Sequence, residues 1–222
     1  MTAQAGNNVY PQNTAHWAAL LGNCGVRSAQ IVTWAPAAAD SLKPGRFSAG
    51  ESELDDFLGN MLHETNMLRN VVENLNYSPE RIRELGLMYG PNSRWAAAAR
   101  QANDLAGQPE ALAEVLYSGR FGNTAPGDGW NYRGRGIPQI TFKSNYEFVG
   151  DLIGQDLVGL PGLLEQPRFA LDAGLAWWEK KIPDSILGDD RAVRIKVQGS
   201  SLGLAECVRI ANKARASLAG LV

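Results

Sequence analysis

The chain has 222 residues, of which 45% are hydrophobic and 20% charged, so it has the composition and length of a globular protein with a sizeable core. Its 21 Lys and Arg residues against 23 Asp and Glu residues give a net charge of −2, which argues against nonspecific binding to nucleic acid or anionic membranes. Apolar runs are too short to cross a bilayer, so no stable membrane association is expected.

The N-terminal stretch MTAQAGNNVYPQNTAHW has neither a basic start nor an apolar core, so no secretion signal of the usual kind is expected. The two cysteines, Cys24 and Cys207, lack the short spacing of a zinc site or a redox pair. They are interpreted as separate buried thiols.

Helical patterns begin close to the N-terminus. A short helix is predicted over residues 14–21 with Asn13 or Thr14 as its N-cap, and a second over residues 28–40 that Pro36 interrupts. The clearest helix is predicted from residue 51 to about residue 65, and its apolar face is formed by Leu54, Phe57, Leu58, Met61 and Leu62. Ser48 and Glu51 have the spacing of a capping box at its start.

The remaining chain continues this helical character. Further helices are predicted over residues 78–87, 93–106, 109–118, 144–150, 167–180 and 202–218. Residues 119–136 are rich in glycine and predict a loop, with a short hairpin around residues 130–134. Strands do not alternate with helices, so a parallel α/β sheet is not expected, and the sequence indicates no domain boundary.

Glu64 stands at the end of the helix predicted over residues 51–65, on or beside its apolar face. Burial without a cationic partner would favour the protonated carboxyl that a general acid needs. The alternative is that Glu64 belongs to a fraying last turn. Periodicity does not decide between the two.

Glu73 follows nine residues later. In one continuous helix the two glutamates would point to opposite sides, about 13 Å apart along the axis, so a shared site requires the chain to turn between them. The asparagines at positions 66, 70, 74 and 76 favour such a turn. The alternative is an ion pair between Arg69 and Glu73 at the i,i+4 spacing of a helix.

Four segments carry these residues in a fixed order: HETN (63–66), ENLNYS (73–78), GDGWNYRGRGIPQIT (127–141) and NY (145–146). Together they resemble the lysozyme-like branch, from phages and bacteria, of glycoside hydrolase family 19, the chitinase class I family. A looser similarity extends from about residue 26 to residue 218.

The resemblance implies a mainly α, lysozyme-like, two-lobed helical domain of residues 1–222, with a small loop or hairpin region beside a sugar-binding cleft. It also implies inverting hydrolysis of β-1,4 links between N-acetylated hexosamines, without a cofactor. In that reaction one carboxyl protonates the leaving oxygen and another activates water, with about 6.5 to 9.5 Å between them. Glu64 matches the acid, and Glu73 is expected to be the base.

The resemblance further implies residues that contact the sugar. Thr141 matches the hydroxyl residue expected to help hold the attacking water. The expected substrate-binding residues are Trp130, Tyr132, Gln139, Thr141, Asn145 and Tyr146, where aromatic rings can stack on a sugar and amides can pair with its acetamido group.

Each of these positions has a structural alternative. Trp130, Tyr132 and Tyr146 can be core aromatics, and Arg133 and Arg135 are expected to be structural rather than sugar ligands. His63 is expected to be a hydrogen-bonded neighbour of Glu64, because two carboxyls suffice for the cleavage.

Two departures from the family's pattern concern the substrate pocket. In VQGSSLG (197–203), Gln198 and Ser200 stand where family members commonly have the Asn and the second Gly of an Asn-Gly-Gly turn, so a sugar contact from this turn is in doubt. The order GRGIPQ differs from the Gly-Arg-Gly-Pro-Ile-Gln of plant chitinases, which suggests a different pocket.

The expected function is that of a monomeric phage-type endolysin that hydrolyses the glycan strands of bacterial peptidoglycan and so lyses the host. Without a signal, it is expected in the host cytoplasm until a separate protein permeabilises the membrane. The alternatives are a bacterial chitinase acting on N-acetylglucosamine polymers and a catalytically inactive glycan-binding module. A metal-dependent amidase is not favoured, because His16 and His63 lie far apart in the sequence.

Overall fold

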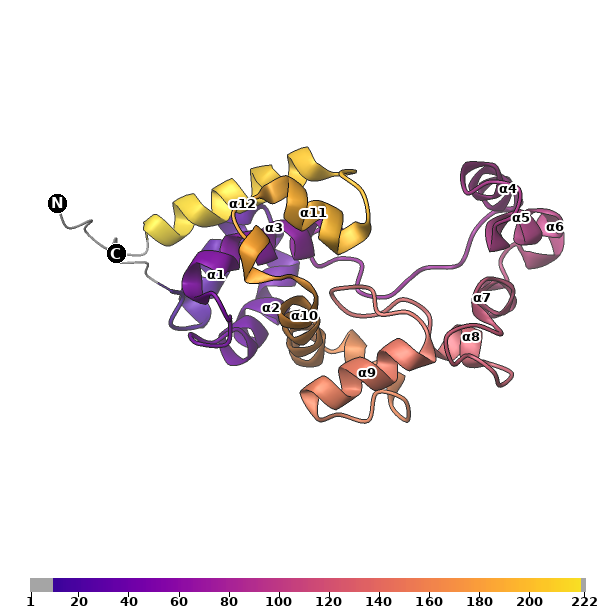
Figure 1. The fold of residues 1–222 in the computed structure, drawn as a ribbon, viewed down its shortest axis with the longest axis horizontal. Helices are drawn as coiled ribbons and strands as arrows, with labels where there is room; N and C mark the ends of the chain where they lie inside the picture. Colours follow the sequence, from indigo (N-terminus) through magenta and orange to yellow (C-terminus); the bar gives the residue numbers. More distant parts are fainter. Residues whose placement is uncertain (1–9, 221–222) are drawn as a thin grey trace. The chain divides into compact units, whose positions relative to one another are not determined.

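In the computed structural model, residues 10–220 are described, and they form helices joined by loops (Figure 1). The expected mainly α class is confirmed. The described residues fall into two compact units: unit 1 comprises residues 10–71, 136–138 and 164–220, and unit 2 comprises residues 72–135 and 139–163. Whether the two units form one catalytic domain stays a prediction. The expected lack of a secretion signal rests on the N-terminal stretch, and residues 1–9 of that stretch lie outside the described part.

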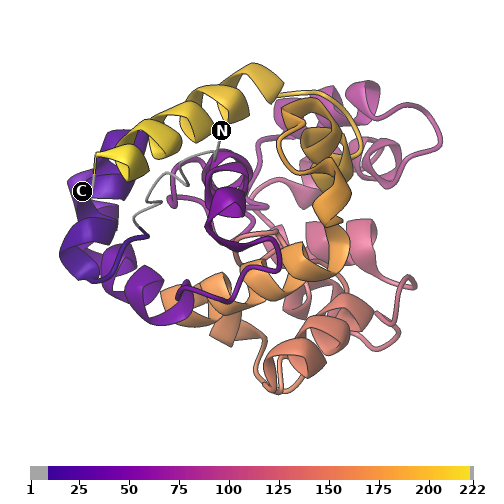
Figure 2. The same cartoon turned by 60° about the vertical axis from the view of Figure 1, so that its left-hand side comes forward.

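Unit 1 is a set of helices around one hydrophobic core. Its helices are α1 (Thr14–Cys24), α2 (Ser28–Ser41), α3 (Leu54–Glu64), α10 (Pro167–Lys181), α11 (Asp190–Gln198) and α12 (Leu204–Ala219), with the 3-10 turns η1 (Gly50–Glu53) and η3 (Asp184–Ile186). Helix α3, in purple, lies in the middle of these helices (Figure 2). Every residue from Leu54 to Leu62 is buried, so α3 is a core helix.

Helices α3 and α12 approach each other at a glycine. A Cβ on Gly59 would lie 2.8 Å from the carbonyl oxygen of Cys207 and 3.0 Å from Cβ of Ala211, so only glycine permits this packing. Cys207 and Cys24 are both buried and free, which confirms their interpretation as separate thiols.

Unit 2 has a smaller core of its own. Its helices are α4 (Pro79–Met88), α5 (Arg94–Ala99), α6 (Ala102–Leu105), α7 (Pro109–Tyr117), α8 (Asp128–Asn131) and α9 (Lys143–Ile153). The 3-10 turn η2 (Pro161–Glu165) lies where the chain returns from unit 2 to unit 1. No helix in the described part of the chain is long and apolar enough to span a membrane.

Several helix starts lie where the sequence predicts them. Asn13 caps α1 by accepting a hydrogen bond from the backbone N–H of His16. Ser78 caps α4 with Pro79 in the first turn. The helices predicted over residues 109–118, 144–150, 167–180 and 202–218 are confirmed as α7, α9, α10 and α12, with ends that differ by a few residues.

Two predictions about the N-terminal helices are wrong. Helix α2 continues through Pro36, because the N–H that proline lacks would have bonded the carbonyl of Val32, a residue exposed on the solvent side. Ser48 is not the N-cap of a helix that begins at residue 51. Its hydroxyl donates to Asp184, 2.8 Å away, and the α-helix begins only at Leu54, after a 3-10 turn.

Three further elements differ from prediction. The helix predicted over residues 93–106 is two helices, α5 and α6, because Gln101 leaves the helical conformation. The hairpin predicted at residues 130–134 is replaced by the short helix α8, and isolated antiparallel bridges instead pair Arg135 with Val72 and Ile140, and Arg120 with Asn123. Helix α11 was not predicted.

Glu53, the residue before α3, is a fully buried carboxyl. Its Oε1 accepts a hydrogen bond of 2.5 Å from Nε1 of Trp178, and its Oε2 accepts one of 3.1 Å from the backbone N–H of Ala49. Burial raises the pKa of Glu53 from 4.5 to about 6. The two hydrogen bonds oppose this increase in the pKa, and the charges of Glu179 and Asp184 add to it.

This pKa predicts a pH-dependent stability. Because the folded state binds the proton of Glu53 more tightly than the unfolded state, its contribution is complete below pH 4.5 and is lost as the pH rises through about 6. Between about pH 4 and pH 7, the wild type should therefore lose about 2 kcal/mol of unfolding free energy relative to Glu53→Gln, measured by urea denaturation, with most of the loss between pH 4.5 and 6. Parallel curves for the two proteins would contradict this role.

Candidate active site

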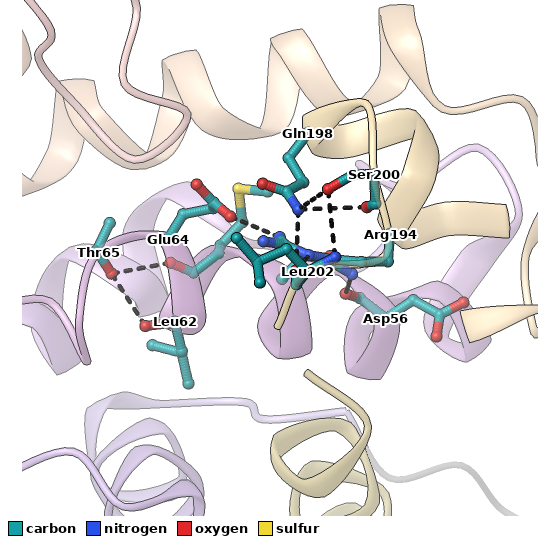
Figure 3. Close-up of polar contacts among 10 residues, drawn as sticks. Asp56, Leu62, Glu64, Thr65, Arg194, Gln198, Ser200 and Leu202 are labelled. Atoms are coloured by element: carbon teal, nitrogen blue, oxygen red, sulfur yellow. Dashed lines mark hydrogen bonds and ion pairs between the residues drawn. The ribbon is translucent and has the colours of Figure 1, made fainter. Parts of the chain in front are cut away.

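The carboxylate of Glu64 ends the buried helix α3 and is fixed by an arginine. Nη1 of Arg194 donates to Oε1 of Glu64 over 2.5 Å (Figure 3). The arginine side chain is 2% exposed and the glutamate side chain 27% exposed. Oε2 of Glu64 accepts no hydrogen bond from the described residues, so one carboxyl oxygen is held and the other is free. Glu64 thus has a cationic partner, and the burial without one that would favour a protonated carboxyl is not found.

Arg194 is itself held by the turn between α11 and α12. Its Nε donates to the carbonyl oxygen of Leu202 over 2.8 Å. The side-chain amide of Gln198 donates to that same carbonyl oxygen over 2.9 Å and to Oγ of Ser200 over 2.7 Å (Figure 3). Gln198 and Ser200, the residues that depart from the family's pattern, therefore stabilise the turn that positions the arginine.

The same turn packs against the residue before Glu64. A Cβ on Gly203 would lie 2.3 Å from Nε2 of His63, and Gly203 has a φ of 80°, so both space and backbone conformation require glycine here. The imidazole of His63 forms no hydrogen bond with the described residues. Its expected role as a hydrogen-bonded neighbour is therefore not seen, and it is a packing contact of the turn.

The chain reverses directly after Glu64, as a shared site requires. Asn66, Met67 and Leu68 have φ angles of 50°, 59° and 62°, a left-handed run that costs roughly 1–2 kcal/mol for each residue with a side chain. Thr65 offsets this cost, because its hydroxyl donates to the carbonyl of residue 61 over 2.8 Å and accepts from the N–H of Leu68 over 3.0 Å. The helix cannot continue toward Glu73.

The alternative ion pair of Glu73 with Arg69 is not formed. Nε of Arg69 donates to the carbonyl oxygen of Asn66 over 2.8 Å, and its Nη2 donates to the side-chain oxygen of the same residue. Arg69 therefore belongs to the left-handed turn.

Glu73, in unit 2, is half-buried and held by two donors. Its Oε1 accepts a hydrogen bond of 2.6 Å from the hydroxyl of Tyr117, and its Oε2 accepts one of 3.1 Å from the N–H of Gly134. The N–H of Glu73 also donates to the carbonyl of Gly134 over 2.8 Å. A Cβ on Gly134 would lie 2.8 Å from Oε1 of Gln139 and 3.4 Å from Oε2 of Glu73, so glycine permits this close approach.

Tyr117 is a permanent donor to this carboxylate. Burial, followed by the charge of Glu73 and the hydrogen bond to it, raises the pKa of Tyr117 far above its ordinary value of 10.0. The phenol is therefore protonated at neutral pH and donates a hydrogen bond to Glu73. Burial and then the same charge also raise the pKa of Tyr77.

Three of the expected substrate-binding residues follow Gly134 in one polar segment. The hydroxyl of Thr141 donates to the carbonyl of Gln139 over 3.1 Å, and Nδ2 of Asn145 donates to the carbonyl of Thr141 over 2.7 Å. Gln139 has a φ of 51° and lies beside Gly134. Gly134 thus lies beside both Glu73 and Gln139, and Thr141 bonds to Gln139, while the roles of these residues toward a sugar stay predictions.

Tyr132 and Tyr146 occupy the core, as the alternative for these residues states. They are 6% and 0% exposed, and their rings pack edge to face at 5.3 Å. The hydroxyl of Tyr146 donates to the carbonyl of Arg133 over 2.6 Å and accepts from Arg135 over 3.0 Å. Both tyrosines and the buried Arg135 therefore hold the glycine-rich segment in shape.

Trp130 is partly buried, and its ring packs against the guanidinium of Arg133. The guanidinium of Arg133 lies 3.6 Å from the centre of its ring, and Nη1 of that arginine donates to the carbonyl of Trp130 over 3.0 Å. The indole thus forms a cation–π contact within the motif. A sugar contact from Trp130 stays a prediction.

Sequence reasoning missed Arg194 and Tyr117, the two residues that hold the carboxylates. The signal for α11 was present, since Asp189 caps it and Gly199 ends it. No sequence signal identifies Tyr117 as the partner of a residue 44 positions away. Among residues 10–220, no group of three or more His, Cys, Asp and Glu side chains could hold a metal ion.

Each carboxylate thus has its own support, and neither is a fraying or freely solvated surface group. Glu64 presents one free oxygen at a helix end, and Glu73 accepts hydrogen bonds at both oxygens. A carboxyl with a free oxygen can give a proton to a bound group, and a fixed carboxylate can accept one from water.

Comparison with known proteins gives a sequence relative. A Haemophilus influenzae protein described as a glycosyl hydrolase family 19 domain-containing protein is 36% identical over 103 residues. The match covers 46% of this chain and 48% of that protein, so the chain spans about half the length of the curated relative it matches. No protein-family model matches the chain.

Two solved structures share the fold over nearly the whole chain. Chitinase C from Streptomyces griseus has a TM-score of 0.60 and 16% sequence identity, and a mutant of chitinase C has a TM-score of 0.57 and 17% identity. Each comparison covers 96% of this chain and 95% of the other. The expected lysozyme-like helical fold is thereby confirmed, and so is the resemblance of this chain to glycoside hydrolase family 19.

Proposed function

We propose that this chain is a glycoside hydrolase that cleaves β-1,4 bonds of bacterial peptidoglycan with inversion, using Glu64 as the acid and Glu73 as the base. The observation that carries the proposal is that both motif glutamates are fixed, half-buried carboxylates with dedicated donors: Arg194 for Glu64, and Tyr117 with Gly134 for Glu73. A surface glutamate needs no such support.

Glu64 acts through the oxygen that Arg194 leaves free. The guanidinium fixes Oε1 and so the plane of the carboxyl, and the proton is carried on Oε2, where it is given to the glycosidic oxygen as the bond breaks. The left-handed turn after Glu64 prevents the helix from covering this oxygen with a further turn.

Glu73 takes the proton from the attacking water. Tyr117 and Gly134 each donate to one of its oxygens, and each oxygen retains acceptor capacity for a water molecule. Thr141, as the resemblance implies, helps to hold that water. Inversion requires this water on the sugar face opposite the leaving group.

The polymer and the biological setting are part of the proposal. The family relative and the chitinase neighbours support a glycan of N-acetylated hexosamines. The motifs ENLNYS and WNYRGRG resemble those of the lytic branch more than those of plant chitinases, which favours peptidoglycan over chitin. An enzyme of this kind acts as a monomeric endolysin that accumulates in the host cytoplasm and reaches the wall once another protein permeabilises the membrane. Chitin oligomers are the comparison substrate, because the solved neighbours are chitinases.

The substitution Glu64→Gln tests the acid. The amide keeps an oxygen that Arg194 can bond but has no proton to give usefully, so kcat on purified sacculi should fall by about 10² to 10⁴. New reducing ends are measured by borohydride reduction and mass spectrometry, and the reduced sugar identifies the bond cut.

The exposed Glu110→Gln in α7 serves as the matched control and should keep wild-type activity. Near-normal turnover by Glu64→Gln with an unchanged melting temperature would contradict the proposed mechanism. A wild type that binds glycans but releases no reducing ends would instead identify an inactive binding module.

Tyr117→Phe tests the support of the base. It removes only the hydroxyl that positions Oε1 of Glu73, so kcat should fall roughly tenfold while KM changes little. Tyr77→Phe removes a hydroxyl that forms no hydrogen bond with the described residues and should change kcat less than twofold. Equal effects of the two substitutions on kcat would refute a specific role for Tyr117.

A further inference from the structure

Unit 2 carries an open groove that the proposed reaction does not use. Its walls come from the end of α4, the loop to α5, the start of α5 and the end of α7. The side chains that matter are Tyr89, Arg94, Trp95, Tyr117 and Arg120, and we name this site the arginine groove.

One wall of the arginine groove is an aromatic platform. The rings of Tyr89 and Trp95 are stacked, with centroids 6.1 Å apart and planes 18° apart. Tyr89 is 59% exposed although its ring stacks on Trp95, and so large an exposed fraction is unusual for an aromatic side chain. An exposed, rigid ring of this kind offers its face to the apolar face of a sugar.

The groove is also positively charged. Neither Arg94 nor Arg120 forms an ion pair with any carboxylate in the described part of the chain. Nη2 of Arg94 reaches only the carbonyl oxygen of Ser118 at 3.5 Å, and the guanidinium of Arg120 lies over the rings of Phe121 and Phe142 at 5.4 and 5.1 Å. None of the described side chains that line the groove is acidic, although the chain as a whole has a net charge of −2.

Tyr117 links this groove to the proposed base. Its side chain lines the groove, and its hydroxyl donates to Oε1 of Glu73 over 2.6 Å. A glycan bound in the groove therefore lies one side chain away from the carboxylate. This contiguity makes the groove a continuation of the surface where the substrate of Glu73 binds.

We propose that the arginine groove binds a muramic acid unit of the glycan strand, with its sugar ring on Tyr89 and its carboxylates on Arg94 and Arg120. The proposal rests on the proposed glycoside hydrolase function and names the substrate class of that site. Muramic acid carries carboxylates, either on its lactyl group or on the stem peptide attached to it. Chitin is neutral and offers these two arginines hydrogen-bond acceptors but no anion, so the charge pattern favours peptidoglycan.

The test measures binding by isothermal titration calorimetry, with the full chain carrying Glu64→Gln to prevent turnover. Three ligands are compared: soluble glycan strands with intact stem peptides, the same strands after amidase removal of the stems, and a chitin hexamer. The variant Arg94→Gln/Arg120→Gln is matched by Arg83→Gln/Arg100→Gln, which removes the same charge from a separate hollow of unit 2. Thermal melting checks that all three chains fold.

The groove variant should bind intact strands about tenfold more weakly than its parent, while its affinity for the chitin hexamer changes less than twofold. If the loss is seen only with intact strands, the stem peptide supplies the carboxylates. If stripped strands show it as well, the groove also accepts the lactyl carboxylate, which is free only once the stem has been removed. Higher salt should weaken strand binding by the parent more than by the groove variant. The matched Arg83→Gln/Arg100→Gln variant should behave like the parent.

Equal affinities of parent and groove variant for the strands would overturn the proposal, and so would an equal loss for strands and chitin. These binding results do not depend on catalysis. If the wild type cut neither sacculi nor chitin, the proposed hydrolysis would fail while the calorimetry would still decide whether the arginine groove recognises carboxylated glycan.

Discussion

The ion pair between Arg194 and Glu64 is the interaction on which the candidate site in unit 1 depends. Burying a guanidinium costs several kcal/mol unless it is paired and its remaining donors are bonded. Arg194 satisfies this condition through Glu64 on one side and the carbonyl of Leu202 on the other. The pair therefore ties the end of α3 to the α11–α12 turn, and the burial of α3 and its packing on α12 through Gly59 hold the pair in place.

Glu73 in unit 2 is held by a different kind of donor from the one that holds Glu64. There the carboxylate is held by neutral donors, the phenol of Tyr117 and the backbone of Gly134, and no arginine or lysine among residues 10–220 is paired with it. Glu64 is thus held at one oxygen by a cation and Glu73 at both oxygens by neutral donors, so the two carboxylates have different surroundings. The glycine-rich motif supplies the second set of surroundings, because only a residue without a Cβ lets its N–H reach the carboxylate.

The departure from the family's Asn-Gly-Gly pattern has a structural meaning in this chain. Gln198 and Ser200 bond within the turn and toward Leu202, so the turn supports the arginine with its own side chains. Arg94 and Arg120 of unit 2, by contrast, have no ion-pair partner in the described part of the chain, and the proposed recognition of substrate carboxylates rests on them.

The sequence alone determined the helical class and most of the helices, because periodic burial and caps such as Asn13 and Ser78 are local properties of the chain. Its short motifs also singled out the two carboxylates as candidates. It also indicated the break after Glu64 through its asparagines. Only the tertiary structure decided what surrounds the glutamates: Arg194 lies 130 positions from Glu64 and Tyr117 lies 44 positions from Glu73. It likewise decided that Pro36 stays inside a helix and that Tyr132 and Tyr146 are core residues. The physical reason is that such partners are selected by burial and by the demand that buried polar groups be paired, and these conditions exist only once distant segments have packed together.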